Sequence, residues 1–100
     1  LEVERLLRRA GEGDSEAVAA LFEPYRQRLR KMVQMRIDRR LQGRVDASDV
    51  LQEAYLDAAR RLSEYDRERQ LPLFLWLRLI TGQRLLHIQF HARQPPSISY

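Results

Sequence analysis

Apolar residues recur three and four positions apart along this chain, and that spacing is its strongest constraint on the fold. Residues spaced in this way lie on one side of an α-helix, where they can be buried together. The spacing occurs near residues 3–10, 18–41, 50–62 and 73–88, and no stretch alternates as a strand would. The sequence therefore predicts an all-α fold, a compact bundle of three to four helices around one core.

Glycine and proline interrupt the first half of this pattern. Gly11 and Gly13 should end a short first helix, and Asp14 is well placed to cap the second. Pro24 lies inside the second helix and has no N–H for a helical hydrogen bond, so we expect a kink or a break there. Beyond that point the apolar spacing predicts that the helix continues to Leu41.

The second half of the chain predicts two further helices. The third should begin at Asp46, a good capping residue, and end near Leu62. Residues 63–71 lose the apolar spacing and are rich in charge, so they are predicted to form a loop. Pro72 suits the first position of a fourth helix, where its missing N–H costs nothing. Trp76 falls on the apolar side of that helix, which predicts a place in the core.

Charge is sorted into blocks along the chain. Counting Lys and Arg against Asp and Glu, residues 1–25 carry −3, residues 26–45 carry +7, residues 46–70 carry −3 and residues 71–100 carry +3. All but one of the 18 cations are Arg, which suits bidentate contact with phosphate and carboxylate groups. Such blocks indicate different partners for different surfaces, although solvated helix faces in an Arg-rich chain explain them equally well.

Several chemistries lack the residues that would carry them. Cysteine is absent, which excludes disulfides and zinc sites with Cys ligands, and no phosphate-binding, nucleophile-elbow or metalloprotease motif occurs. His87 and His91 sit four positions apart, but no acidic residue follows Glu68, so a helix surface or a nucleic-acid contact is favoured over a metal site. No apolar run is long enough to cross a bilayer. We therefore expect no enzymatic activity, no metal and no cofactor.

The third predicted helix has an acidic, polar side opposite its apolar stripe. Asp49, Gln52 and Glu53 form an Asp-x-x-Gln-Glu pattern near its start, and a basic helix with a Trp-Leu-Arg motif at Trp76 follows. Over residues 13–93 this arrangement resembles region 2 of the bacterial sigma-70 family, in its extracytoplasmic-function (ECF) branch. The resemblance implies a cytoplasmic transcription initiation factor that binds RNA polymerase core and promoter DNA.

The resemblance also implies a polymerase-binding surface. In the family, the helix with the Asp-x-x-Gln-Glu pattern docks on the coiled-coil clamp helices of the β′ subunit. The residues implied for that role in this chain are Asp49, Gln52, Glu53, Leu56 and Asp57. Polar side chains one turn apart suit hydrogen bonding to a basic coiled coil, while the apolar stripe behind them fixes the helix in its domain.

The loop and the last helix resemble the regions that melt and read the −10 promoter element. ECF members hold an extruded base of the non-template strand against that loop, where Tyr65 would offer a stacking surface. The DNA-binding residues implied in this chain are Tyr65, Arg67, Arg69, Gln70, Arg78, Arg84, Gln89 and Arg93. Primary sigma factors open the duplex with two adjacent tryptophans, whereas Leu75 precedes Trp76 here, so we do not expect an aromatic wedge.

The resemblance predicts that residues 1–94 form the polymerase- and −10-binding domain and that residues 95–100 begin a linker. A helix-turn-helix domain that reads the −35 element would follow, outside this chain. An anti-sigma factor is a common further partner in this branch. Two other functions stay open on the residues alone: an all-α protein-interaction adaptor, and a duplex-DNA-binding helix-turn-helix regulator.

Overall fold

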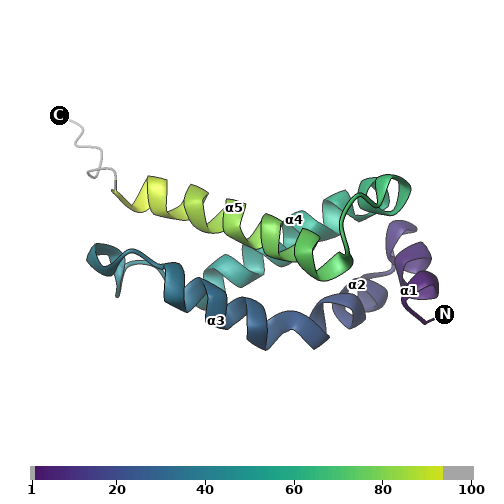
Figure 1. Ribbon diagram of the computed structural model, residues 1–100, viewed down its shortest axis with the longest axis horizontal. Coiled ribbons are helices and arrows are strands. Elements are labelled where there is room, and N and C mark those ends of the chain that lie inside the picture. The colour runs from purple at the N-terminus through teal and green to yellow at the C-terminus, as the bar shows by residue number, and fades with distance from the viewer. Residues whose placement is uncertain (1, 94–100) are drawn as a thin grey trace.

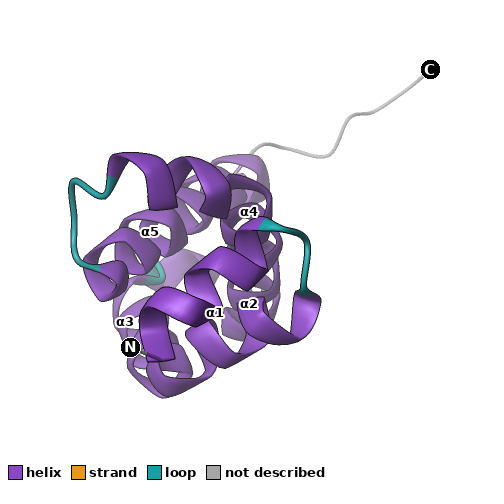
Figure 2. Cartoon of the chain, turned by 90° about the vertical axis from the view of Figure 1, so that its right-hand side faces the viewer, coloured by secondary structure: helices purple, strands orange, loops and turns teal. Residues whose placement is uncertain are grey.

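The computed structural model describes residues 2–93, and every regular element in that part of the chain is a helix (Figure 1 and Figure 2). In chain order the elements are α1 (Glu2–Gly11), α2 (Ser15–Phe22), the 3-10 helix η1 (Glu23–Tyr25), α3 (Arg26–Arg36), the 3-10 helix η2 (Arg39–Leu41), α4 (Ala47–Glu68) and α5 (Leu73–Arg93). Because α2, η1 and α3 amount to one interrupted helix, the predicted all-α bundle of three to four helices is confirmed. The predicted linker, residues 95–100, lies outside the described residues.

Pro24 breaks the long helix, as its position predicts. A proline inside a helix removes one N–H and crowds the preceding turn. In this chain α2 ends at Phe22, one 3-10 turn contains Pro24, and α3 begins at Arg26. The two helices on either side of the break both pack against α4.

The end of α3 differs from the prediction, which placed it at Leu41. The helix stops at Arg36, and Ile37 adopts an extended backbone. Asp38 explains the early end, because its side chain accepts a hydrogen bond from the backbone N–H of Arg40 at 3.0 Å and so starts η2. Short polar side chains compete in this way with the helical backbone for N–H groups.

Asp46 caps α4 as predicted, because its side chain accepts a hydrogen bond from a backbone N–H of the first turn at 2.8 Å. The predicted end near Leu62 is wrong, since α4 continues to Glu68. Of the predicted loop over residues 63–71, only residues 69–71 lie outside a helix. Leu62 and Tyr65 are both buried, so the apolar spacing extends for one more turn. The charged residues that suggested a loop lie mostly on the exposed side of this turn.

A short turn at residues 69–72 joins α4 to α5. Arg69 adopts the left-handed conformation with a φ of 38°, and its N–H donates to the Tyr65 carbonyl at 2.7 Å. The carbonyl of Pro72 accepts a hydrogen bond from the N–H of Trp76 at 3.1 Å, inside the first turn of α5. Because α5 begins one residue after Pro72, this proline immediately precedes the helix instead of occupying its first position.

Two clusters of buried side chains hold the bundle together. The larger cluster draws on all five α-helices and contains Trp76, which is 8% exposed, so the predicted core position of this side chain is confirmed. The smaller cluster surrounds Val33, Val50 and Leu85, where α3, the start of α4 and the second half of α5 meet. The two clusters together fix which sides of α4 and α5 stay exposed.

Candidate binding surfaces

One side of α4 is polar, acidic and exposed. Asp49, Gln52, Glu53 and Leu56 are spaced three, one and three residues apart, which places them on one side of the helix. All four are exposed, and half of the surface of Leu56 is accessible. The other side of the helix is buried in the core through residues such as Ala54. Four of the five residues predicted to bind polymerase therefore lie together, and we call them the α4 face.

Asp57, the fifth of these residues, lies between α4 and α5 and not on the α4 face. Its side chain is 12% exposed, and its carboxylate oxygens lie 3.2 Å from Arg60 and 3.3 Å from Arg61. Arg84 on α5 approaches the same group, with 3.8 Å between Nε and Oδ2. A buried carboxylate needs nearby positive charge to offset its lost hydration. Asp57 and Arg84 therefore serve the packing of α4 against α5. The sequence had predicted a polymerase contact for Asp57 and a DNA contact for Arg84.

Tyr65 also has surroundings that differ from the prediction. Its ring is buried and stacks on Trp76, with 4.6 Å between the ring centroids and 30° between the planes. Its hydroxyl donates a hydrogen bond to the Leu71 carbonyl at 2.6 Å, and burial raises its pKa. The expectation of an aromatic ring exposed in a loop is wrong, because Tyr65 continues the apolar stripe of α4.

Three residues near Tyr65 were also predicted to contact DNA, and they differ in whether their side chains already bind other residues of the protein. Arg67 and Gln70 are exposed. The Arg69 guanidinium donates to both carboxylate oxygens of Glu4, at 2.6 and 2.8 Å, and to Asp66 at 2.7 Å. These hydrogen bonds, the one to Glu4 first, raise the pKa of Arg69, and the same contact lowers the pKa of Glu4. Arg69 therefore joins the turn to α1.

A cavity of about 180 Å³ opens beside this turn, and we call it the turn cavity. The stacked pair of Tyr65 and Trp76 contributes aromatic surface to its lining. Glu68, Arg69 and Gln70 contribute polar groups from the end of α4 and from the turn. A hollow with an aromatic wall and several hydrogen-bonding groups suits a flat, polar ring system.

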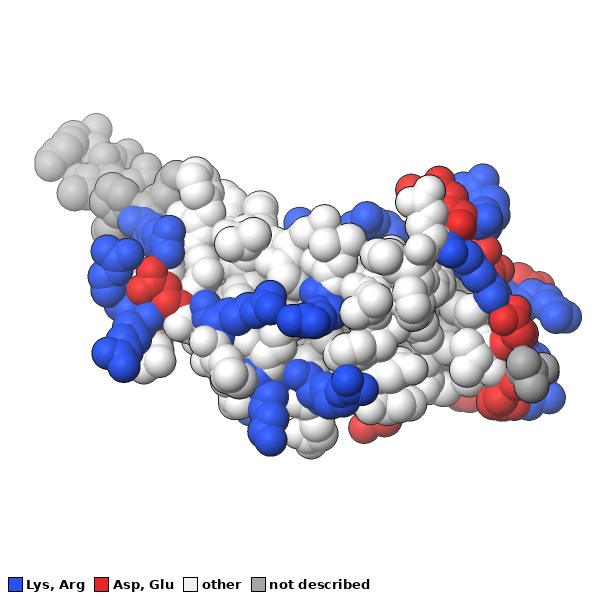
Figure 3. Space-filling view, viewed as in Figure 1, with Lys and Arg blue, Asp and Glu red and all other residues white. Residues whose placement is uncertain are grey.

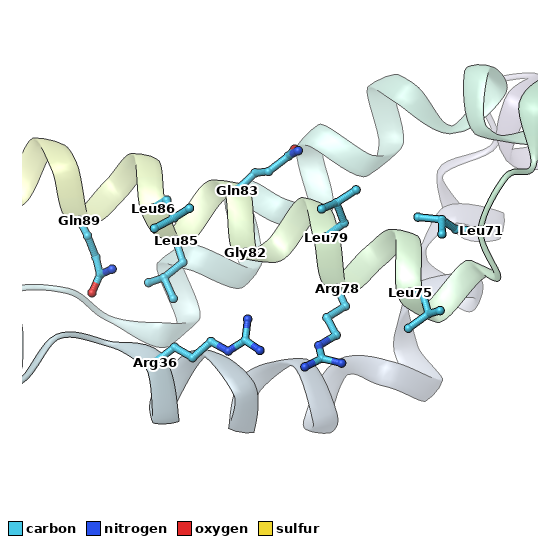
Figure 4. A pocket seen from close by; sticks show the side chains of 10 residues that line it. All are labelled: Arg36, Leu71, Leu75, Arg78, Leu79, Gly82, Gln83, Leu85, Leu86 and Gln89. Atoms are coloured by element: carbon cyan, nitrogen blue, oxygen red, sulfur yellow. The ribbon is translucent and has the colours of Figure 1, made fainter.

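A larger hollow of about 640 Å³ lies between α3 and α5, and we call it the basic groove. Figure 4 shows Arg36 from α3 and Arg78 from α5 pointing into the space between the two helices. Leu75, Leu79 and Leu86 add apolar surface from α5. On this face basic side chains cross the middle of the molecule, and acidic ones gather mostly at the end where α1 lies (Figure 3). The groove combines positive charge with apolar surface.

Arg36 lines the basic groove but was not among the predicted DNA-binding residues, and neither were its neighbours on α3. The +7 charge of residues 26–45 was the available signal, but charge along the chain does not say which side of a helix faces α5. Arg28, Arg30 and Lys31 are also exposed on α3. Arg28 lies over the ring of Phe74, 4.1 Å from its centroid, and this cation–π contact directs it toward α5.

Gln89 and Arg93, at the far end of α5, both bind Asp38. Gln89 is 7% exposed, and its Oε1 accepts a hydrogen bond from the Asp38 N–H at 2.7 Å. Arg93 and Arg40 reach Asp38 Oδ2 at 2.7 and 3.2 Å. The hydrogen bonds from Arg40, with a smaller contribution from Arg93, lower the pKa of Asp38 from 3.8 to about 2. Gln89 was predicted to contact DNA, but its side chain instead joins α5 to Asp38.

Neither a metal site nor a membrane span is found in residues 2–93. His87 and His91 lie side by side, with 4.5 Å between their ring centroids. No group of three or more His, Cys, Asp or Glu side chains in the described part of the chain is arranged to hold a metal ion. None of the helices there is both long and apolar enough to cross a membrane.

Comparison with known proteins gives one match. A family model described as ECF sigma factor matches residues 1–93, nearly the whole chain. No curated protein and no solved structure matches the chain significantly. The family match confirms the resemblance that rested on the Asp-x-x-Gln-Glu pattern and the Trp-Leu-Arg motif.

Proposed function

Since the chain belongs to the ECF sigma factor family, we propose that its α4 face docks on the β′ clamp helices of RNA polymerase and that its basic groove and turn cavity hold the non-template strand of the −10 element. Members of this family are non-enzymatic transcription initiation factors that bind RNA polymerase core and promoter DNA. One observation carries the proposal: α4 contributes no residue to the basic groove. An acidic surface and a basic one can therefore engage two partners at once.

The α4 face has the composition of a polar docking surface. Asp49, Gln52 and Glu53 supply acceptors and one amide donor, and the apolar side chain of Leu56 follows them at the C-terminal end of the face. A basic coiled coil would place its cations against the carboxylates, and Leu56 would add apolar contact area beside them. The helix needs no rearrangement for this, because its other side is already fixed in the core.

The basic groove suits a single strand. Arg36 and Arg78 would contact phosphates, and the leucines of α5 would contact the faces of unstacked bases. Paired duplex DNA hides those base faces, so the apolar part of the groove is useful only for an opened strand. Trp76 is buried and cannot act as a wedge between base pairs, so the proposed role of the chain is to capture the opened strand.

The turn cavity is the proposed place for the extruded base. Gln70 is exposed at its edge and carries both a hydrogen-bond donor and an acceptor, so it can read the Watson–Crick edge of a base. Tyr65 would contribute as part of the cavity wall while it remains stacked on Trp76. The proposed contacts to the base are therefore Gln70 and the wall of the cavity, and Arg67, which is exposed on the last turn of α4 outside the cavity, is proposed as a phosphate contact.

Replacing Gln70 with alanine should change which base is preferred at the extruded position. The substitution removes the donor and the acceptor at the edge of the turn cavity and leaves the core untouched. The measurement is binding of the chain, assembled with RNA polymerase core, to four pre-melted promoter bubbles that differ only at that base. Gln42→Ala is the matched control, since Gln42 is also exposed but lies outside the cavity. An unchanged order of preference in Gln70→Ala would remove the turn cavity from the proposal.

Replacing Arg78 with alanine should weaken binding to all four bubbles by a similar factor. A phosphate contact carries no base information, and losing one should reduce the slope of log affinity against log salt by about one counterion. Titration of the same assembly over a range of salt concentrations measures this slope. Arg8→Ala, an exposed substitution on α1 away from the groove, should leave it nearly unchanged. Equal slopes for Arg78→Ala and the unsubstituted chain would argue against DNA in the basic groove.

Family membership also bears on the partners of the chain and on where it acts. Because the family match spans residues 1–93, we retain neither the adaptor nor the helix-turn-helix regulator. Anti-sigma factors are frequent partners in this family, and one would act here by covering the α4 face or the basic groove. Because sigma factors act on RNA polymerase inside the cell, the proposed place of action is the cytoplasm.

A further inference from the structure

We propose that Glu4, on α1, is a positioning residue that holds the turn at residues 69–72 in the shape needed to discriminate between bases. The inference rests on the proposed function of the turn cavity. Glu4 does not line that cavity and has no proposed contact with DNA or polymerase. Its influence would pass through Arg69, which does line the cavity. Figure 2 views the bundle from the end where α1 lies in front of the other helices.

The backbone of the turn needs outside support. Arg69 has φ 38° and ψ 48°, a left-handed conformation in which residues other than glycine are disfavoured. Such a conformation persists when surrounding contacts over-determine it. One of these contacts is local, from the Arg69 N–H to the Tyr65 carbonyl at 2.7 Å.

The contact with Glu4 is the long-range support for Arg69. Two parallel hydrogen bonds, Nη1 to Oε1 at 2.6 Å and Nη2 to Oε2 at 2.8 Å, join residues 65 positions apart in the chain. Asp66 accepts a further bond from Nη2 at 2.7 Å. The bidentate pair fixes the plane of the guanidinium as well as its distance from α1. The direction in which Arg69 leaves the turn is therefore set by α1.

Exposure decides what this contact can do. The side chains of Arg69 and Glu4 are 37% and 49% exposed, so solvent screens the pair and its contribution to global stability is small. A small contribution is still enough to bias the conformation of a four-residue turn. We therefore expect the loss of Glu4 to alter the turn and leave the melting temperature nearly unchanged.

The opposite end of the turn has its own anchor. The hydroxyl of Tyr65 binds the Leu71 carbonyl at 2.6 Å, and the ring of Tyr65 is held by Trp76. Gln70 thus lies between two anchored residues, which fixes where its backbone stands and so the region of the turn cavity that its side chain can reach. Without Glu4 one anchor is lost, and Arg69, which keeps its contact with Asp66, has less of its charge neutralised and attracts DNA phosphates more strongly. Discrimination between bases should fall while overall affinity is kept or rises.

The test compares Glu4→Gln with Glu2→Gln, a matched control on the same helix that pairs with Arg5 one turn away. Each variant chain is assembled with RNA polymerase core and bound to the four bubbles that differ at the extruded base. For Glu4→Gln we expect the ratio of affinities for the best and worst base to fall about two- to fivefold, the range for loss of an exposed ion pair. Glu2→Gln should leave this ratio unchanged.

A second measurement needs no DNA. Amide hydrogen exchange in the chain alone should speed up about two- to fivefold across residues 69–71 in Glu4→Gln, and it should stay unchanged in Glu2→Gln. Suppose that Glu4→Gln leaves both the affinity ratio and the amide exchange at residues 69–71 unchanged, while Gln70→Ala alters the base preference. That result would overturn the inference and leave the proposed function standing. No effect of Gln70→Ala would overturn both. A melting temperature clearly lowered by Glu4→Gln would show a structural role instead.

Discussion

Replacing Gln52 and Glu53 together with alanine should lower the affinity for the β′ clamp helices by about tenfold or more, which is the effect of removing an interface hot spot. Both side chains are exposed on the α4 face, and alanine is the best helix former. The double substitution therefore removes docking groups and leaves the helix and core intact. Calorimetric titration of the chain with a β′ clamp-helix fragment measures the affinity, and thermal unfolding checks the fold.

Glu64→Ala provides the matched control for that experiment. Glu64 is exposed on the same helix but lies beyond the α4 face. It should bind the fragment as the unsubstituted chain does. If the double variant also binds normally while its melting temperature is unchanged, α4 is not the docking helix and the first half of the proposed function fails.

Replacing Trp76 with alanine should lower the free energy of unfolding by about 3–5 kcal/mol, the usual cost of deleting a buried large aromatic side chain. The indole is 8% exposed, belongs to the larger core cluster and stacks on Tyr65. Since domains of this size are stable by about 5–15 kcal/mol, the substitution should remove a large part of the total stability. Urea denaturation followed by circular dichroism measures the change.

Phe90→Ala is the control for the tryptophan experiment, because Phe90 is an aromatic residue of the same helix that is 60% exposed. Its removal should change the free energy of unfolding by no more than about 0.5 kcal/mol. A Trp76→Ala chain that unfolds like the unsubstituted one, yet fails to open promoters, would contradict the core assignment. The aromatic wedge would then have to be reconsidered.

Much of the architecture follows from interactions between residues close in sequence. Asp46 accepts its hydrogen bond from an N–H of the next turn, and Pro24 breaks the helix because it has no backbone N–H of its own. The positions of Gln52 and Glu53 on the exposed side follow from the helical period of the apolar residues around them. Features of this kind are readable from sequence, because their physical causes lie within a few residues.

The tertiary structure decided where several polar residues find their partners. Asp57 meets Arg84 from α5, Gln89 meets Asp38, and Arg69 meets Glu4. Asp57, Arg84, Gln89 and Arg69 were each expected on a partner-binding surface, since a polar side chain at the edge of a helix stripe looks the same in the sequence whether it faces solvent or a neighbouring helix.

The length of α4 was decided in the same way. The charged residues around Tyr65 predicted a loop, but packing of its ring on Trp76 stabilises one more helical turn. Helix ends depend on such packing because the intrinsic preference of a few residues is weak. By itself, the sequence determined the helical class, the family and the α4 face, which are properties of local period and motif. Only the folded chain decided which arginines pair with acidic residues and which line the basic groove, because the helices bring their partners from distant positions.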